Sequence, residues 1–150
     1  AGKSLGQIGA AATEQVDRIV VLLGSPDTEE REAAAKALGA IGPLASQTAP
    51  SLIAALKDPE PAVVQSAVGA LAQMGASVKR DIPLLVDNLS TSNNALKLAT
   101  LQAIGQLASH AESAADSIQN CLSDRNKTVS ETARATLEKI QRAAQAVAGR

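Results

Sequence analysis

Apolar residues recur along this 150-residue chain at a fixed spacing of 33 positions. One series consists of Leu5, Leu38, Leu71, Ile104 and Leu137. Two parallel series are Ile8, Ile41, Met74, Leu107 and Ile140, and Leu23, Leu56, Leu89 and Leu122. A fixed period of roughly 20–50 residues is typical of a solenoid, in which each repeat buries its apolar face only against its neighbours.

Each repeat contains two stretches with helical periodicity, which we call the inner and the outer helix. In the second repeat, the inner helix has its apolar stripe at Ala49, Leu52, Ile53 and Leu56, and the outer helix at Val63, Ala67, Ala70, Leu71 and Met74. The pattern predicts an all-α, right-handed α-solenoid of about four αα-hairpins, forming one domain over residues 1–150. The predicted units are 14–42, 47–75, 80–108 and 113–141, preceded by a partial helix at 4–9.

Residues with a strong preference for helix ends stand at repeated positions. The predicted N-caps of the outer helices are Ser25, Asp58, Thr91 and Asp124, with Pro26 and Pro59 following two of them. Thr48 and Asp81 are the predicted caps of two inner helices, ahead of Pro50 and Pro83 in the first turn. Gly42 and Gly75 are expected to end two outer helices with a positive φ.

Within this pattern, residues 49–76 resemble a HEAT repeat of the short bacterial type found in phycobilisome-lyase-like proteins. The pattern returns at 16–42, 82–109 and 115–141, so the resemblance extends over almost the whole chain. HEAT repeats usually carry a basic residue just after the valine that opens the outer helix. Here that position reads Arg31, Val64, Lys97 and Ser130, which departs from the family pattern in two units.

The charged residues near the outer helices alternate between units. Arg31 and Lys97 are followed 27 positions later by Asp58 and Asp124. One interpretation is that these are solvated surface charges, which contribute little to stability. The other interpretation is an ion pair between consecutive repeats, Arg31 with Asp58 and Lys97 with Asp124.

Composition argues against several classes of function. The chain has no Phe, Tyr or Trp and a formal net charge of −1, so it lacks stacking platforms for bases and a basic field that attracts nucleic acid. No run of 18 apolar residues is present, which predicts no membrane insertion. A single cysteine fits a reducing compartment, and we therefore favour the cytoplasm. The chain is expected to be monomeric or part of a longer protein.

The sequence offers little reactive chemistry. His110 has no further ligand at metal-binding spacing, and it is expected near the end of an outer helix, where a cation complements the helix dipole. Cys121 has no basic neighbour and is expected to act as a small hydrophobe on a groove wall. We therefore expect no catalytic, metal or cofactor site, and no enzyme activity of the chain alone.

The predicted function is a protein-interaction or scaffolding module that binds a protein partner through the concave face of the solenoid. Two alternatives stay open: a subunit of an enzyme like the bilin lyases, which the resemblance implies, and a structural spacer within a longer protein. The predicted groove is formed by inner-helix residues that point away from the core: Arg18, Val21, Leu22, Ser51, Ala54, Ala55, Leu84, Asp87, Asn88, Ser117 and Asn120. A competing surface lies on the outer helices, around Val68, Leu98 and Leu101.

Overall fold

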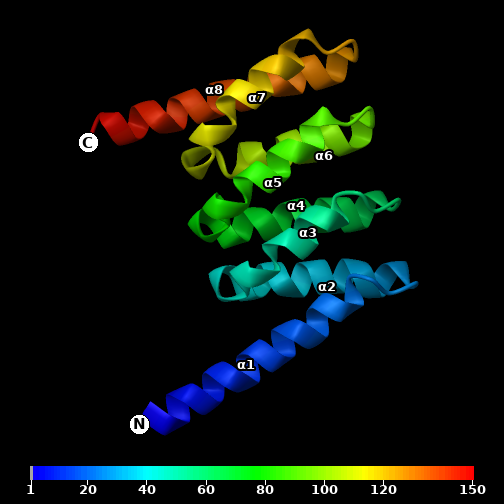
Figure 1. Cartoon of the computed structure of the whole chain (residues 1–150), viewed down its shortest axis with the longest axis vertical. Coiled ribbons are helices and arrows are strands. Elements are labelled where there is room, and N and C mark those ends of the chain that lie inside the picture. Colours follow the sequence, from blue (N-terminus) through cyan, green and yellow to red (C-terminus); the bar gives the residue numbers. More distant parts are fainter. Residues whose placement is uncertain (1) are drawn as a thin grey trace.

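The computed structural model describes the backbone of residues 2–150 and the side chains of residues 12–150. Helices are stacked in pairs along one axis (Figure 1). The long helices are α2 (Thr28–Ile41), α4 (Pro61–Met74), α6 (Asn94–Gln106) and α8 (Lys127–Ala148). The other layer contains α1 (Gly2–Leu22) and the short helices α3 (Ala49–Ala55), α5 (Ile82–Asp87) and α7 (Ala115–Asn120).

Short 3-10 segments connect the helices: η1 (Gly42–Thr48), η2 (Gly75–Asp81), η3 (Asn88–Ser90), η4 (Ala108–His110), η5 (Glu112–Ala114) and η6 (Cys121–Ser123). The described residues contain helices and turns but no strand. The chain is thus an all-α solenoid, as the period predicts. The predicted outer helices are the long helices, which pack directly on one another in the order α2, α4, α6, α8.

The predicted apolar stripes form one continuous core. In α4, Val63, Ala67 and Leu71 are fully buried, and α6 and α8 bury their equivalents. The inner stripe is fully buried in the second repeat but less so at the end of the stack, where Leu122 is 37% exposed while its counterpart Leu56 is 2% exposed. The last repeat therefore leaves part of its inner stripe exposed, as expected where a repeat has a neighbour on one side only.

The first helix differs from the sequence prediction. A separate partial helix was expected at 4–9, followed by an inner helix from residue 16. Instead, α1 is continuous from Gly2 to Leu22, because residues 10–15, which join the two predicted helices, contain no proline or glycine and begin with three alanines, which favour helix. The side chains of Leu5 and Ile8 lie outside the described part of the chain.

The N-caps of the long helices lie two residues later than predicted. Their N-caps are Asp27, Glu60, Asn93 and Asn126. The predicted caps instead close the preceding turn: Asp58 Oδ1 accepts a hydrogen bond from the N–H of Glu60 at 2.9 Å, and Asp124 Oδ1 from that of Asn126 at 2.8 Å. Ser25 and Thr91 do the same with their hydroxyl oxygens. An Asx or Ser/Thr turn therefore precedes each cap, because these side chains reach a backbone N–H two residues on as readily as one inside a helix.

The short helices and the glycines follow the prediction more closely. Pro50 and Pro83 stand in the first turns of α3 and α5. Thr48 occupies the cap position of α3 but makes no capping bond; its hydroxyl donates to the carbonyl of Ala45 at 2.7 Å. Gly42 and Gly75 follow α2 and α4 with φ of 66° and 56°, a region that glycine occupies without strain.

Candidate binding surfaces

Arg31 bridges the first two repeats. Its Nε donates to Asp58 Oδ2 at 2.7 Å and its Nη2 to Asp58 Oδ1 at 3.1 Å, while Nη1 donates to the carbonyl of Ser25 at 2.9 Å. The two charged side chains are only 12% and 9% exposed. Of the two interpretations left open by the sequence, the inter-repeat ion pair is therefore the one observed.

The same contact recurs two repeats later. Lys97 Nζ lies 2.6 Å from Asp124 Oδ2, and these side chains are 15% and 13% exposed. The hydrogen bond from Arg31 lowers the pKa of Asp58, and the bond from Lys97 together with the N–H of Asn126 lowers the pKa of Asp124. Both carboxylates therefore stay ionised to lower pH than a free aspartate.

The interface between α4 and α6 replaces these groups with uncharged ones. Val64 stands at the position of Arg31 and Lys97, and Thr91 at that of Asp58 and Asp124. Asn88 replaces Ala55 and Cys121, and it is 8% exposed, with no hydrogen-bond partner for its Nδ2 among the described residues. We call the α2–α4, α4–α6 and α6–α8 contacts the first, middle and third interfaces.

Most of the predicted groove residues lie at the surface of α1, α3, α5 and α7, which we call the short-helix face. Val21 is 75% exposed, Leu22 42% and Leu84 41%. Arg18, Ala54, Asp87 and Asn120 are exposed, and Ser51, Ala55 and Ser117 are half-buried. One residue of the predicted groove is not part of this surface: Asn88 is buried in η3, the turn that follows α5.

Two repeat-equivalent hollows open on this face. One of about 410 Å³ lies between α1 and α3 and is lined by Val20, Leu23, Ser51, Ala54 and Ala55. The other, of about 220 Å³, lies between α5 and α7 and is lined in part by Ser117, Asn120 and Cys121. Ala54 and Ala55, the predicted floor of the groove, both line the first of these hollows.

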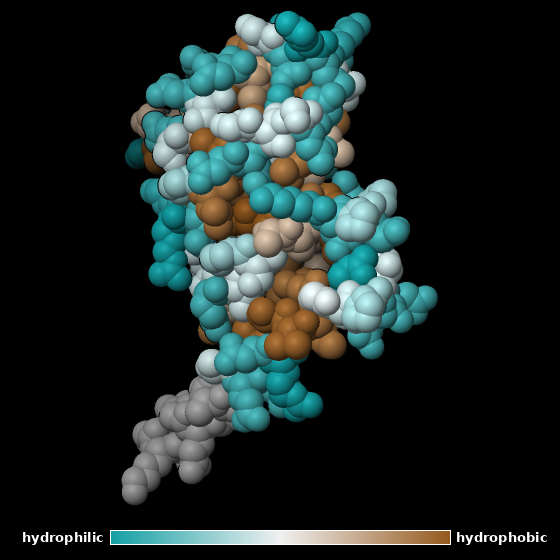
Figure 2. All heavy atoms as spheres, turned by 45° about the vertical axis from the view of Figure 1, so that its right-hand side comes forward, coloured by the Kyte–Doolittle hydropathy of each residue, from teal (hydrophilic) through white to brown (hydrophobic). Residues whose placement is uncertain are grey.

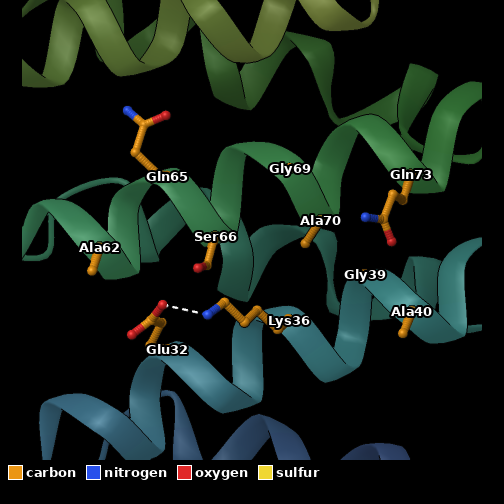
Figure 3. A pocket seen from close by; sticks show the side chains of 10 residues that line it. All are labelled: Glu32, Lys36, Gly39, Ala40, Ala62, Gln65, Ser66, Gly69, Ala70 and Gln73. Atoms are coloured by element: carbon orange, nitrogen blue, oxygen red, sulfur yellow. Dashed lines mark ion pairs between the residues drawn. The ribbon is translucent and has the colours of Figure 1, made fainter.

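A third hollow, which the sequence prediction missed, lies on the long helices. It has a volume of about 400 Å³ and runs between α2 and α4 (Figure 3). Small residues such as Gly39, Ala62 and Ala70 line it, and the Glu32–Lys36 ion pair stands at one end. The backbones of α2 and α4 approach closely beside the hollow, since a Cβ placed on Gly39 would lie 2.8 Å from the Cα of Ala70. The small side chains of the lining leave the hollow open. The signal in the sequence was the set of small residues on two successive outer helices, among them Gly39, which is buried in the contact.

A cleft of about 310 Å³ opens in the middle interface. It lies where α4 and α6 begin, at the edge of the molecule that faces forward in Figure 2, where brown side chains are seen between teal rims. Of the predicted competing surface, Val68 and Leu101 are 6% and 0% exposed and belong to the core instead. Leu98 remains half-buried and lines the cleft.

The reactive side chains do not form a centre. Among the described residues no group of three or more His, Cys, Asp or Glu could hold a metal ion. Burial raises the pKa of the Cys121 thiol, whose Sγ lies 3.8 Å from the carbonyl oxygen of Ser117. Because a thiol with a raised pKa is mostly protonated at neutral pH, Cys121 is a poor nucleophile. His110 is half-buried in η4, after the end of α6.

None of the described helices combines the length and apolar character needed to cross a membrane.

The family model for HEAT repeats matches residues 1–72 and 16–105. The chain therefore belongs to the HEAT-repeat proteins, the class of helical solenoid that its helix pairs define. No curated protein matches the sequence.

Among the solved structures that resemble this chain are engineered proteins. One engineered protein superposes with a TM-score of 0.54 at 21% identity over 89% of this chain and 65% of its own. A designed armadillo repeat protein in complex with the peptide (KR)4 gives 0.52 at 21% identity, over 81% of this chain and 62% of its own. This chain thus spans less than two-thirds of the length of either, and the likeness shows the fold.

Proposed function

We propose that this protein is a non-catalytic interaction module that binds a protein partner on its short-helix face, the face that the sequence predicts to be concave. The observation that carries the proposal is the exposure of Val21, Leu22 and Leu84 on the helices of the face that has the hollow at Ala54 and Ala55. Exposed apolar side chains grouped around a depression are typical of protein interaction sites rather than of free surface. HEAT and armadillo-like folds commonly serve this role.

Charged residues on either side of the hollow would orient a bound segment. Arg18 is exposed on α1, and Asp87 is exposed on α5. A helix or extended segment lying across Ala54 and Ala55 would therefore meet a cation on one side and a carboxylate on the other. Such a polar rim around an apolar centre fixes orientation and register more than it adds affinity. The designed armadillo neighbour, whose structure holds a peptide, supports peptide binding by a fold of this kind.

The two alternative functions, a bilin lyase subunit and a structural spacer, require different residues at the surface. A subunit of a bilin lyase needs acid–base or aromatic groups beside the pigment, and the sequence supplies one histidine and no aromatic residue. A spacer needs no exposed apolar surface at all, yet Val21 is 75% exposed. These observations favour the interaction module.

The test is capture of partner proteins from a lysate of the source organism by the immobilised chain, read by mass spectrometry. Ala55→Arg fills the hollow and Leu84→Asp charges its wall, so both are expected to abolish capture while helicity and melting temperature stay unchanged. Arg134→Asp, at an exposed position of α8, is the matched control and should capture normally, while Leu98→Asp tests the long-helix side. Unaltered capture by both groove variants, with loss in Leu98→Asp, would place the binding face on the long helices.

A second measurement addresses the enzyme alternative. The purified chain is mixed with a free bilin, and the visible absorption of the protein fraction is recorded after gel filtration. We expect no pigment to remain with the protein. Stable visible absorbance in the protein fraction would favour the lyase-like function over the interaction module.

A further inference from the structure

The first interface is held at two points along its helices. Near the start of α2, Arg31 donates to the two carboxylate oxygens of Asp58 at 2.7 Å and 3.1 Å, and both side chains are nearly buried. Near the end of α2, the backbones approach so closely that a Cβ on Gly39 would lie 2.8 Å from the Cα of Ala70. Contacts at both ends of a helix pair fix the angle between the two helices, because neither end can open without losing one of them.

The third interface is also held at two points. Near the start of α6, Lys97 Nζ lies 2.6 Å from Asp124 Oδ2. Further along, the hydroxyl of Thr136 in α8 donates to the carbonyl of Leu101 in α6 at 3.3 Å, and both residues are buried. Such shielded polar bonds are stronger than exposed ones, because water does not compete for the donor and the acceptor. The residue of the middle interface at the position of Thr136 is Ala103, which has no hydroxyl.

The middle interface has weaker contacts at the same positions. Val64 and Thr91 stand where the neighbouring interfaces have their ion pairs, and neither side chain carries a charge. A hydrogen bond of 3.3 Å joins Gln65 Nε2 to Gln102 Oε1, but both side chains are exposed, so water competes for this bond. Helices α4 and α6 pack less closely than the helix pairs on either side, and the cleft of about 310 Å³ lies between them.

A buried amide further weakens the middle interface. Asn88 is 8% exposed, and its Nδ2 has no hydrogen-bond partner among the described residues. Asn88 stands at the repeat position of Cys121, which lines one hollow together with Lys97 and Asp124. This repeat position therefore lies beside the place of the ion pair. A buried donor without a partner raises the free energy of the closed interface, and opening the interface lets water pair with it.

We infer that the middle interface is the hinge of this solenoid. The first half, α1 to α4, and the second half, α5 to α8, each move as one rigid body, and the angle between α4 and α6 changes at the cleft. The apolar core continues through the interface, with Leu71 and Leu96 buried on its two sides. This core acts as the pivot, so the motion is a bend and not a separation of the halves.

The hinge divides the short-helix face. The hollow at Ala54 and Ala55 lies between α1 and α3, in the first half, and the hollow at Ser117 and Asn120 lies between α5 and α7, in the second half. Bending at the hinge changes the distance between the two hollows and leaves each of them intact. A partner that contacts both hollows would favour one hinge angle. This consequence rests on the proposed function, whereas the hinge itself does not.

Pulsed electron paramagnetic resonance between two spin labels tests the hinge in the full chain without a partner. Cys121→Ala removes the native thiol, and cysteines introduced in pairs carry the labels. Gln73 in α4 and Lys139 in α8 are exposed and lie two long-helix contacts apart, about 16–20 Å at the usual helix spacing. Asp87 in α5 and Lys139 both lie in the second half and form the matched control pair. We expect the distance distribution across the hinge to be at least about twice as wide as that of the control pair.

Further variants place the motion. Val64→Arg with Thr91→Asp supplies the ion pair of the neighbouring interfaces and should narrow the distribution between positions 73 and 139 to the width of the control pair. Arg31→Ala breaks the ion pair of the first interface, which lies outside the labelled span, and should leave this distribution unchanged. Equal widths for the two label pairs in the parent chain would overturn the hinge, whether or not the double variant folds. A wide distribution that the folded double variant retains would also overturn it.

Discussion

The first and third interfaces resemble each other more than either resembles the middle one. Each has a cation on its long helix and a carboxylate on the following turn, Arg31 with Asp58 and Lys97 with Asp124. Each also has a glycine at one helix position, Gly39 in α2 and Gly105 in α6, where α4 has Ala72. The apolar core follows a period of 33 residues. The ion pair and the glycine at the edge of the stack recur only in every second interface.

This difference shows how a repeat protein can vary its surface at constant fold. Helices α2 and α4 pack more closely along their length than α4 and α6 do. The close approach at Gly39 brings the backbones together, and the ion pair closes the edge. In the middle interface, Val64, Thr91 and the extra methyl of Ala72 leave the edge open, and the 310 Å³ cleft results.

The largest expected effect tests whether the interfaces share one core. Leu38→Ala and Leu71→Ala each truncate a fully buried leucine, and each should lower the free energy of unfolding by about 2–5 kcal/mol. Leu122→Ala, at a position that is 37% exposed, is the control and should cost about 1 kcal/mol or less. Urea denaturation measures all three. A small loss for Leu71→Ala beside a large one for Leu38→Ala would mean that the middle interface is also loose in its core.

A second prediction concerns the close approach of the first interface. Gly39→Ala adds a methyl group 2.8 Å from the Cα of Ala70, so it should destabilise by about 1 kcal/mol or more despite the better helix propensity of alanine. Gly69→Ala meets no atom within 4 Å and should stabilise by up to about 1 kcal/mol. Gly105→Ala makes only an ordinary contact, 3.6 Å from Thr136 Oγ1, and should also stabilise. The sign of each change is read from thermal unfolding, and stabilisation by Gly39→Ala would show that the helices can separate freely.

A third prediction tests the ion pairs. A double-mutant cycle of Arg31→Ala and Asp58→Ala should give a coupling energy at least roughly twice that of the Lys127–Glu131 pair. The reason is exposure: the first pair is 12% and 9% exposed, and the second 87% and 63%. The cycle is measured by chemical denaturation at low salt. Equal coupling in both pairs would leave Asp58 with a role in its turn only.

The same pairs set a pH dependence in the acid range. The folded pKa values of Asp58 and Asp124 are lowered, so both groups contribute stability above their unfolded pKa of about 4. That stability is lost as the pH falls through the folded pKa. Asp58→Asn should therefore make the melting temperature less dependent on pH below about pH 4 than in the parent chain. An unchanged slope would mean that other carboxylates control acid unfolding.

The smallest expected effect comes from transferring the ion pair to the middle interface. The double variant Val64→Arg, Thr91→Asp should be more stable than the summed free-energy changes of the two single variants predict. The coupling energy should be below that of Arg31 and Asp58, because α4 and α6 pack less closely than α2 and α4. Denaturation of the four cycle members measures it. A coupling of zero would show that the spacing of the helices, and not only the identity of the side chains, distinguishes the middle interface.

The fold was predictable from the sequence because its signal repeats. The stripe that contains Leu38, Leu71 and Ile104 is buried as predicted, since each copy meets the same environment. The pairing of Arg31 with Asp58 was one of two interpretations, because charge spacing alone does not distinguish a contact from two solvated groups. The N-caps were placed two residues early, at Asp58 for example, because a carboxylate that bonds the N–H two residues on has the same sequence signature in a turn as in a cap.

The surface was harder to predict than the core. Asn88 was assigned to the open groove from its helical angle, yet it is buried in a 3-10 turn, because α5 ends at Asp87 and the direction of the chain changes there. The hollow beside Gly39 and the cleft beside Val64 were not predicted. Both depend on how far apart two helices lie. That distance is set jointly by the side chains that two repeats contribute to the contact.

The sequence by itself determined the period, the helix pairs, the buried stripes and the membership in the HEAT family, since these follow from local periodicity repeated along the chain. The tertiary structure alone decided which charges meet, which turn residues are buried and where the edge of the stack stays open. The physical reason is that such features depend on distances between helices. Those distances are fixed by the smallest side chains in each contact, at Gly39 and Ala70 in the first interface, rather than by the apolar pattern that all repeats share.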